Sequence, residues 1–271
     1  MALKKTNKTA VVLMNLGGPA SLNDVEPFLF NLFFDKAIID LPIILRWPLA
    51  KFIAKKRVAY AQSIYKKIGN ASPILRETRQ QAEALGRALR GAGNFKVFVA
   101  MRHAAPNSID AAKDVKAYNP DKVILLPLYP QFSTTTTASS FAEWDKSSKK
   151  IGLNTQTKKI CCYPENKSFI DAHVQLLKCE IDKNRLVEEN TRILFSAHGL
   201  PQKIINGGDP YESQVHKTVN AVLNKLKKEH NLSPDYRVCY QSKVGPLKWL
   251  APSTSDEIIK AGDEQKSVIV L

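Results

Sequence analysis

Apolar residues recur along the chain in two patterns: continuous runs typical of buried strands, and helically spaced residues typical of helices that bury one face. In the first half of the chain the two patterns alternate through short connections. Such a β-α-β-α-β order predicts a parallel, doubly wound sheet. The strands are expected at residues 9–16, 95–101 and 122–126, and the helices at residues 21–32, 76–90 and 108–118.

The alternation resumes after the polar residues 146–159, which we interpret as the boundary between two lobes. We therefore predict an α/β protein with two Rossmann-like lobes, residues 1–150 and residues 151–271. In the second lobe, strands are expected at residues 158–163, 192–195, 237–240 and 267–271, and helices at residues 166–183 and after Asp209-Pro210. Residues 267–271 are apolar on both faces and predict a core strand with no return helix after it. Either this is an edge strand or the lobe is incomplete, and we expect the second.

Residues 41–70 depart from both patterns because they combine large apolar side chains with seven basic residues and no acidic one. One interpretation is an ordinary amphipathic helix on the protein's own core. The other is an apolar lip that docks on an anionic membrane or covers a flat ligand bearing carboxylates. Prolines at 42 and 48 and the charge of Arg46 exclude a membrane-spanning segment here.

Composition places the chain among globular proteins, with 44% hydrophobic and 24% charged residues. The formal net charge of +15 predicts an anionic partner, but no nucleic-acid-binding motif accompanies it, so nucleic acid is not expected. The four cysteines form no CxxC pair and indicate reduced thiols. Together with the lack of a signal peptide or membrane span, this predicts a cytoplasmic protein, with peripheral association on the inner face of the membrane as a further expectation.

The most informative candidate for chemistry is His198, which follows the apolar residues Ile193–Phe195 at the carboxyl end of a predicted strand. Gly199 and Pro201 turn the chain immediately afterwards. Ligands of open α/β sheets bind at that edge, and an imidazole there accepts a proton near neutral pH or binds iron or zinc. The alternative is a histidine that only satisfies hydrogen bonds of the loop.

Other strand ends also carry polar groups. Arg102 places a permanent charge after the second strand. The hydroxyl-rich loop 127–140 precedes a helix and is either an anion site or a capping segment without a ligand. Asn15–Pro19 lacks the third glycine of a dinucleotide fingerprint, which excludes a nicotinamide site.

Six segments in register resemble the ferrochelatase family over nearly the whole chain. They are Asn15–Pro19, Tyr65–Gly69 with Ser72-Pro73, Tyr129–Gln131, Phe195–Pro201, Gly208–Tyr211 and Gln241–Leu250. The resemblance implies a chelatase-like fold and the insertion of Fe²⁺ into protoporphyrin IX, the last step of haem biosynthesis. It also agrees with the lip interpretation of residues 41–70.

Carried over by position, the resemblance implies that His198 is the catalytic histidine, as a metal ligand or as the acceptor of pyrrole protons. Positions implied to bind or line the porphyrin are Leu16, Arg57, Tyr65, Ser72, Arg102 and Trp249. Ferrous iron is expected as a substrate, with no permanently bound cofactor and no iron-sulfur cluster.

The chain departs from the family pattern at two places. His103 stands where the family usually has tyrosine, and the family's second histidine- and glutamate-bearing element is expected beyond Leu271. The second departure leaves an alternative open, a porphyrin-binding remnant without catalysis. It also predicts that the 271-residue form is poorly soluble or self-associated.

Overall fold

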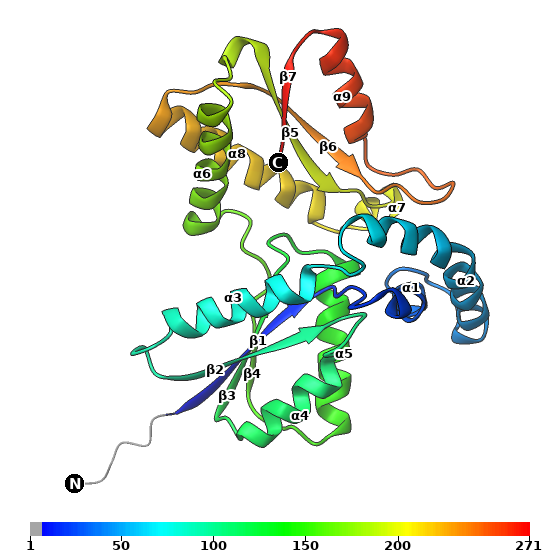
Figure 1. Ribbon diagram of the computed structural model, residues 1–271. Helices are drawn as coiled ribbons and strands as arrows, with labels where there is room; N and C mark the ends of the chain where they lie inside the picture. The colour runs from blue at the N-terminus through cyan, green and yellow to red at the C-terminus, as the bar shows by residue number, and fades with distance from the viewer. Residues whose placement is uncertain (1–6) are drawn as a thin grey trace. The chain divides into compact units, whose positions relative to one another are not determined.

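The computed structural model describes residues 7–271, which form two compact units built on separate sheets (Figure 1). The first unit comprises the chain up to Tyr129 and Ser133–Cys162, and the second comprises Pro130–Phe132 and Tyr163–Leu271. The polar residues 146–159 predict a boundary at residue 150, whereas the first unit extends to Cys162. The strand β4 (Thr157–Lys159), which the predicted boundary places in the second lobe, pairs with the sheet of the first unit.

The first unit is a parallel four-stranded sheet in the order β2-β1-β3-β4. Its elements are β1 (Lys8–Asn15), α1 (Val25–Phe34), α2 (Ile43–Lys67), α3 (Ile74–Ala88), β2 (Asn94–Met101), α4 (Ser108–Tyr118), β3 (Lys122–Pro127), α5 (Ser139–Lys150) and β4. All three strands and all three helices expected before residue 127 are confirmed. α3 lies on one face of the sheet, and α4 and α5 lie on the other (Figure 1).

The core of this unit forms where the continuous apolar strands meet α4 and α5. Val12, Val123 and Leu125 are fully buried together with Ala112 of α4 and Trp144 of α5. Side chains on both faces of β1 are covered, which is why the sequence of this strand shows no alternation. The carboxyl ends of β1 and β2 are thereby fixed side by side.

The second half of the hydroxyl-rich segment 127–140, expected to be a loop, is helical. Thr134–Ala138 form a π-helical turn that leads directly into α5, and the Ser133 side chain accepts a hydrogen bond from the Thr135 amide. Thr135, Thr137 and Ser139 are buried. These hydroxyls therefore cap and pack the start of a helix, which favours the capping interpretation over an open anion site.

The second unit is a parallel sheet in the order β6-β5-β7. Its elements are α6 (Lys167–Lys183), β5 (Thr191–His198), α7 (Gln202–Asn206), α8 (Tyr211–His230), β6 (Asp235–Gln241), α9 (Thr254–Asp263) and β7 (Ser267–Val270). α6 and α8 pack together over Ile193 and Phe195 of β5. α9, which the apolar pattern did not predict, contacts all three strands.

The prediction that residues 267–271 form a strand buried in the core is wrong, because the strand that forms there is partly exposed. β7 pairs with β5 and lies at the edge of the described sheet, and Val270 is 52% exposed. Four apolar residues in a row are equally compatible with a central and an edge strand, because periodicity reports the faces of a strand and not its neighbours. None of the helices within residues 7–271 has the length and apolar character needed to cross a bilayer.

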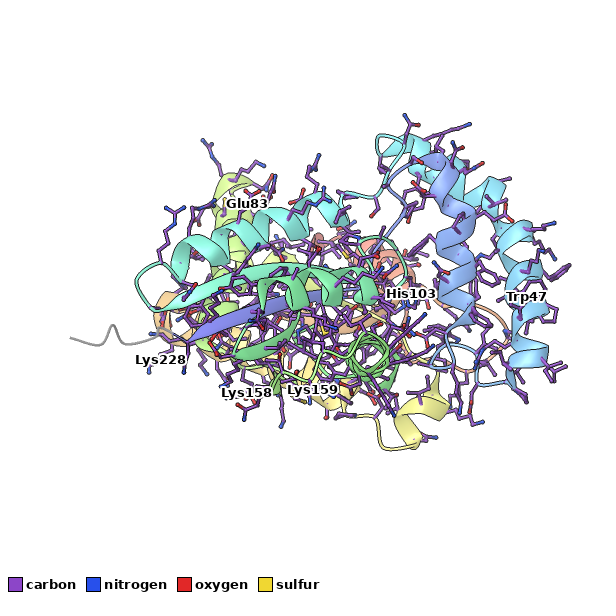
Figure 2. All side chains as sticks on the ribbon, turned by 90° about the horizontal axis from the view of Figure 1, so that it is seen from below. Trp47, Glu83, His103, Lys158, Lys159 and Lys228 are labelled. Carbon is purple, nitrogen blue, oxygen red and sulfur yellow. The ribbon has the colours of Figure 1, made fainter. Side chains whose placement is uncertain are left out.

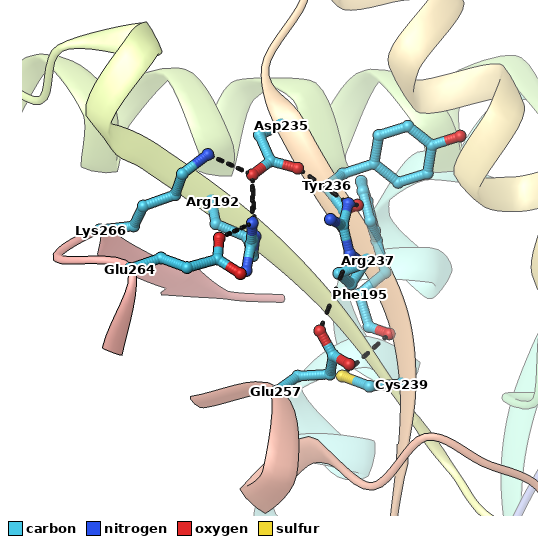
Figure 3. A network of polar contacts seen from close by, with 9 residues as sticks. All are labelled: Arg192, Phe195, Asp235, Tyr236, Arg237, Cys239, Glu257, Glu264 and Lys266. Carbon is cyan, nitrogen blue, oxygen red and sulfur yellow. Dashed lines mark hydrogen bonds and ion pairs between the residues drawn. The ribbon is translucent and has the colours of Figure 1, made fainter. Parts of the chain in front are cut away.

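A network of charges joins the three strands of the second unit at their amino-terminal ends (Figure 3). Arg192 of β5 is almost completely buried, and its guanidinium binds Asp235 at 2.7 Å and Glu264 at 2.6 Å. Asp235 also accepts hydrogen bonds from Lys266 and Arg237. Burial acts to raise the pKa of Asp235, but these hydrogen bonds and charges outweigh it and lower the pKa to about 2.

Candidate active site

In the first unit, glycines bring the loops after β1 and β2 together with the start of α3. Gly17 has a φ of +86°, and a side chain there would meet the Ala104 Cβ at 2.9 Å. A side chain on Gly18 would meet the Ser72 Cβ at 2.6 Å. Two backbone hydrogen bonds complete the contact, from the Ser72 amide to the Pro19 carbonyl and from the His103 amide to the Leu16 carbonyl. Only glycine fits this approach.

This arrangement gathers three of the predicted substrate-binding residues, Leu16, Ser72 and Arg102, at one edge of the sheet. Arg57 and Tyr65 belong to α2, which packs against α1. The Arg57 guanidinium lies 5.6 Å from the centre of the Phe33 ring of α1, and burial raises the pKa of the Tyr65 hydroxyl. Each of the five side chains is partly exposed, as a ligand contact requires.

Arg102 has intramolecular partners that the sequence did not indicate. Its Nη2 lies 2.9 Å from the Asp35 carboxylate, and its Nε donates to the Ser139 Oγ at 2.7 Å. Ser139 in turn donates to Asp35. Only 16% of the Arg102 side chain is exposed, at a cavity of about 830 Å³ that none of the other predicted residues lines. Asp35 already neutralises the charge of Arg102, so a substrate carboxylate would have to compete with Asp35 for the guanidinium. Binding of a substrate carboxylate by Arg102 stays a prediction.

His103 follows the carboxyl end of β2 and is almost completely buried beside this pair (Figure 2). Its Nε2 is 3.8 Å from Asp35, and the Asn31 side chain donates to its backbone carbonyl. Burial and the adjacent Arg102 charge lower the pKa of His103 to about 4, against the opposing effect of Asp35. The residue is therefore a neutral packing group at neutral pH.

This depressed pKa predicts acid sensitivity. The unfolded chain binds a proton at His103 near pH 6.5, whereas the folded chain binds it near pH 4. The free energy of unfolding should therefore fall between pH 6.5 and pH 4, by up to about 3 kcal/mol. Denaturant titrations at several pH values measure this change. Compared with the unmodified chain, the free energy of unfolding should depend less on pH in His103→Tyr and equally on pH in the control His230→Gln, which alters an exposed histidine. Equal slopes for all three proteins would contradict the assignment.

In the second unit, His198 ends β5 on a turn that is held from three sides. The Gly199 amide donates to the Gln241 carbonyl at 2.8 Å, and the Leu250 amide donates to the Leu200 carbonyl. The Tyr211 hydroxyl is hydrogen-bonded to the His198 backbone. A side chain on Gly199 would lie 3.0 Å from the Gln241 oxygen and 3.2 Å from the Trp249 ring. Trp249 therefore packs directly against the turn that presents His198.

The chemical state of His198 follows from this setting. Its side chain reaches the surface, yet the surrounding protein partly desolvates the ring and lowers the pKa of His198 below its ordinary value. The imidazole is consequently neutral at pH 7, with a free lone pair for a proton or a metal ion. No group of three or more His, Cys, Asp or Glu side chains within residues 7–271 is arranged to hold a metal.

Some residues that shape the site escaped the sequence analysis. Asp35 lies at the end of α1 without any flanking motif, and it meets Arg102 only through the fold. Tyr211 belongs to a segment that we had associated with the family, but its hydrogen bond to the His198 backbone is not readable from spacing. Both interactions join residues that are distant in sequence, where local patterns carry no signal.

Comparison with known proteins identifies the class. The ferrochelatase family model matches residues 8–271. Ferrochelatase from Rickettsia bellii (strain OSU 85-389) is 50% identical over 267 residues, which cover 97% of this chain and 72% of that protein. Ferrochelatase from Wolbachia sp. subsp. Drosophila simulans (strain wRi) is 49% identical over 97% of this chain and 83% of its own length. The chain therefore belongs to the ferrochelatase family.

Among solved structures, the sirohydrochlorin chelatase SirB from Bacillus subtilis subspecies spizizenii, in complex with cobalt, covers 97% of this chain with a TM-score of 0.45 and 10% identity. So weak a likeness does not itself define the fold. The two parallel sheets flanked by helices establish the predicted α/β class directly.

Proposed function

We infer that this protein is a ferrochelatase that inserts ferrous iron into protoporphyrin IX to form haem. The observation that carries this inference is the family match over residues 8–271, supported by relatives that share about half of their residues with the chain. The non-catalytic alternative is not favoured by these comparisons, because the relatives at this level of identity are named as the enzyme.

The proposed mechanism assigns proton removal to His198. A porphyrin holds two pyrrole N–H protons, and both must leave when the metal enters the ring. A base with a pKa near or below neutrality accepts such protons efficiently, and the neutral imidazole of His198 at the end of β5 meets that requirement. The backbone contacts of Gly199 and Tyr211 fix the turn and thus the position from which the His198 side chain projects.

Each unit carries residues that we propose contact the substrate. In the first, Leu16 and Ser72 supply an apolar and a hydroxyl contact at the glycine-rich loop, and Arg57 and Tyr65 of α2 supply groups for the propionates. In the second, Trp249 offers an aromatic surface beside His198. Binding energy from these remote contacts can be used to bend the macrocycle, a device that supplies about 1 to 5 kcal/mol.

The test is anaerobic incubation of the full chain with protoporphyrin IX and Fe²⁺, followed by the absorption spectrum of haem. We expect haem to form at a rate proportional to protein concentration. Porphyrin binding, seen as a shift of the absorption bands, without any metal incorporation would instead establish the non-catalytic alternative.

We further propose that α2 is an apolar lip that attaches the protein to anionic membranes. The helix packs its small residues Ala50 and Ala54 inward, and it leaves Ile44 and Phe52 82% and 63% exposed. Trp47 (Figure 2) is about half exposed, and the rest of its ring packs edge-on against Phe30 of α1, with the ring centroids 6.3 Å apart. An ordinary amphipathic helix would bury such side chains, so this arrangement favours the lip interpretation. Basic residues interleaved with exposed apolar ones suit an anionic lipid surface.

Membrane binding is expected to depend on charge. Each lysine near an anionic surface contributes about 1 kcal/mol, so Lys55→Gln/Lys56→Gln should weaken binding to phosphatidylserine-containing vesicles by roughly 30-fold at low salt. High salt should weaken binding of the unmodified protein as well. Vesicle sedimentation measures both effects. The control Lys149→Gln/Lys150→Gln removes the same charge from the end of α5 and should bind normally. Equal binding to neutral and anionic vesicles would contradict the proposal.

A further inference from the structure

Two of the four cysteines, none of which forms a disulfide, lie next to each other outside the candidate active site. Cys161 and Cys162 follow β4, at the point where the chain leaves the first unit for the second. Their Sγ atoms are 3.1 Å apart, Cys161 is exposed, and Cys162 is partly exposed. Two thiols within hydrogen-bonding distance of each other are thus accessible to the solvent.

The backbone on either side of the pair is fixed. The Ile160 amide donates to the Leu125 carbonyl, and the Tyr163 amide donates to the Pro130 carbonyl. Because Cys161 and Cys162 are adjacent in the chain, the backbone itself keeps their thiols together, which lowers the ordering cost of binding a group to both.

A disulfide is a poor product for this pair. Adjacent Cα atoms are about 3.8 Å apart across a trans peptide bond, which is below the range of about 4.4 to 6.8 Å that unstrained disulfides require. Partial desolvation by the surrounding protein and the neighbouring Cys162 thiol also raise the pKa of Cys161 to about 11, so the thiolate is scarce at neutral pH. Reaction with simple alkylating reagents should therefore be slow.

A single atom that binds both sulfurs avoids this strain. Bonds from sulfur to a metal are about 2.3 Å long, so two sulfurs separated by 3.1 Å both reach one central atom. Zinc is disfavoured, because it needs four ligands and residues 7–271 contain no cluster of three or more metal-binding side chains. Trivalent arsenic is satisfied by two thiols and one further substituent.

We propose that Cys161 and Cys162 form a bidentate site for trivalent arsenic compounds. With an organoarsenic oxide, two As–S bonds form and the two S–H bonds break. The two protons leave with the oxide oxygen as one molecule of water, and arsenic stays trivalent. The step therefore needs no oxidant or reductant, and it does not require a free thiolate in advance.

The test uses phenylarsine oxide, the full chain and intact mass spectrometry after gel filtration. We expect one adduct per chain, which an excess of a dithiol such as dithiothreitol removes and which equimolar glutathione leaves in place. Cys161→Ser and Cys162→Ser should each lose the adduct. Cys179→Ser, which changes an exposed single thiol, should keep it.

A second measurement guards against misfolding of the variants. Cys161→Ser and Cys162→Ser should melt at the same temperature as the unmodified chain, since neither side chain is in a core cluster. Iodoacetamide should modify Cys179 faster than either member of the pair. An adduct that survives Cys161→Ser, or one that is lost in Cys179→Ser, would overturn the proposal, as would the absence of any adduct on the unmodified chain.

Discussion

Replacement of His198 by alanine is expected to lower the rate of Zn²⁺ insertion into a water-soluble porphyrin by at least about 100-fold, the usual contribution of a positioned general base. Porphyrin affinity should change little, because the loops that carry Leu16 and Ser72 are untouched. Porphyrin fluorescence follows both the binding and the metal insertion. The loss should therefore appear in kcat and leave the dissociation constant of the porphyrin nearly unchanged.

The matched control is His216→Ala, which removes an exposed histidine from α8 of the same unit and should keep the full rate. The pH profile gives a further check. Since desolvation lowers the pKa of His198, the rate should stay constant down to pH values below 6.5 and fall only when the imidazole becomes protonated. An alanine variant with undiminished turnover would remove His198 from the mechanism.

The second large effect is expected on stability. Asp235→Asn should lower the free energy of unfolding of the second unit by about 3 kcal/mol, because it leaves the buried Arg192 with Glu264 as its remaining charged partner. The value lies at the low end for buried pairs because 22% of the Asp235 side chain is exposed. Denaturant titration followed by circular dichroism measures the loss. Asp263→Asn, on the exposed end of α9, should be neutral.

The same network predicts how acid affects this unit. Because the pKa of Asp235 is lowered to about 2 from an ordinary value of 3.8, its contribution to stability is complete above pH 4 and is lost as the pH falls toward 2. The free energy of unfolding of Asp235→Asn should therefore depend less on pH between pH 4 and pH 2 than that of the unmodified chain. If the variant unfolds at the same denaturant concentration as the unmodified chain, the network is not a stabilising one.

The strands and most helices could be predicted because their signal is local. The run that becomes β1 is apolar on both faces and ends at Gly17, and Asn166 caps α6 through its own side chain. His198 could be singled out for the same reason, since an apolar run, a histidine and a Gly-x-Pro break are adjacent in sequence.

The features that were missed depend on distant residues. Thr157–Lys159 carry no apolar signal, and only pairing with β3 makes them part of the first sheet. The local pattern predicts only that Arg192 begins a strand, because the acids that neutralise it lie 43 and 72 residues further along the chain. Asp35 illustrates the same limit at the candidate site, because nothing near it in sequence indicates that it holds Arg102.

The packing of α2 reverses the usual relation between residue size and tolerance to substitution. On most surface helices, small positions accept almost any residue and large apolar ones do not. Here Ala50 and Ala54 are completely enclosed beside α1, so that even leucine would force the two helices apart. Ile44 and Phe52 contribute little to folding and accept polar replacements freely. A mutational scan of this helix would therefore separate selection for folding, concentrated at the alanines, from selection for function, concentrated at the largest side chains.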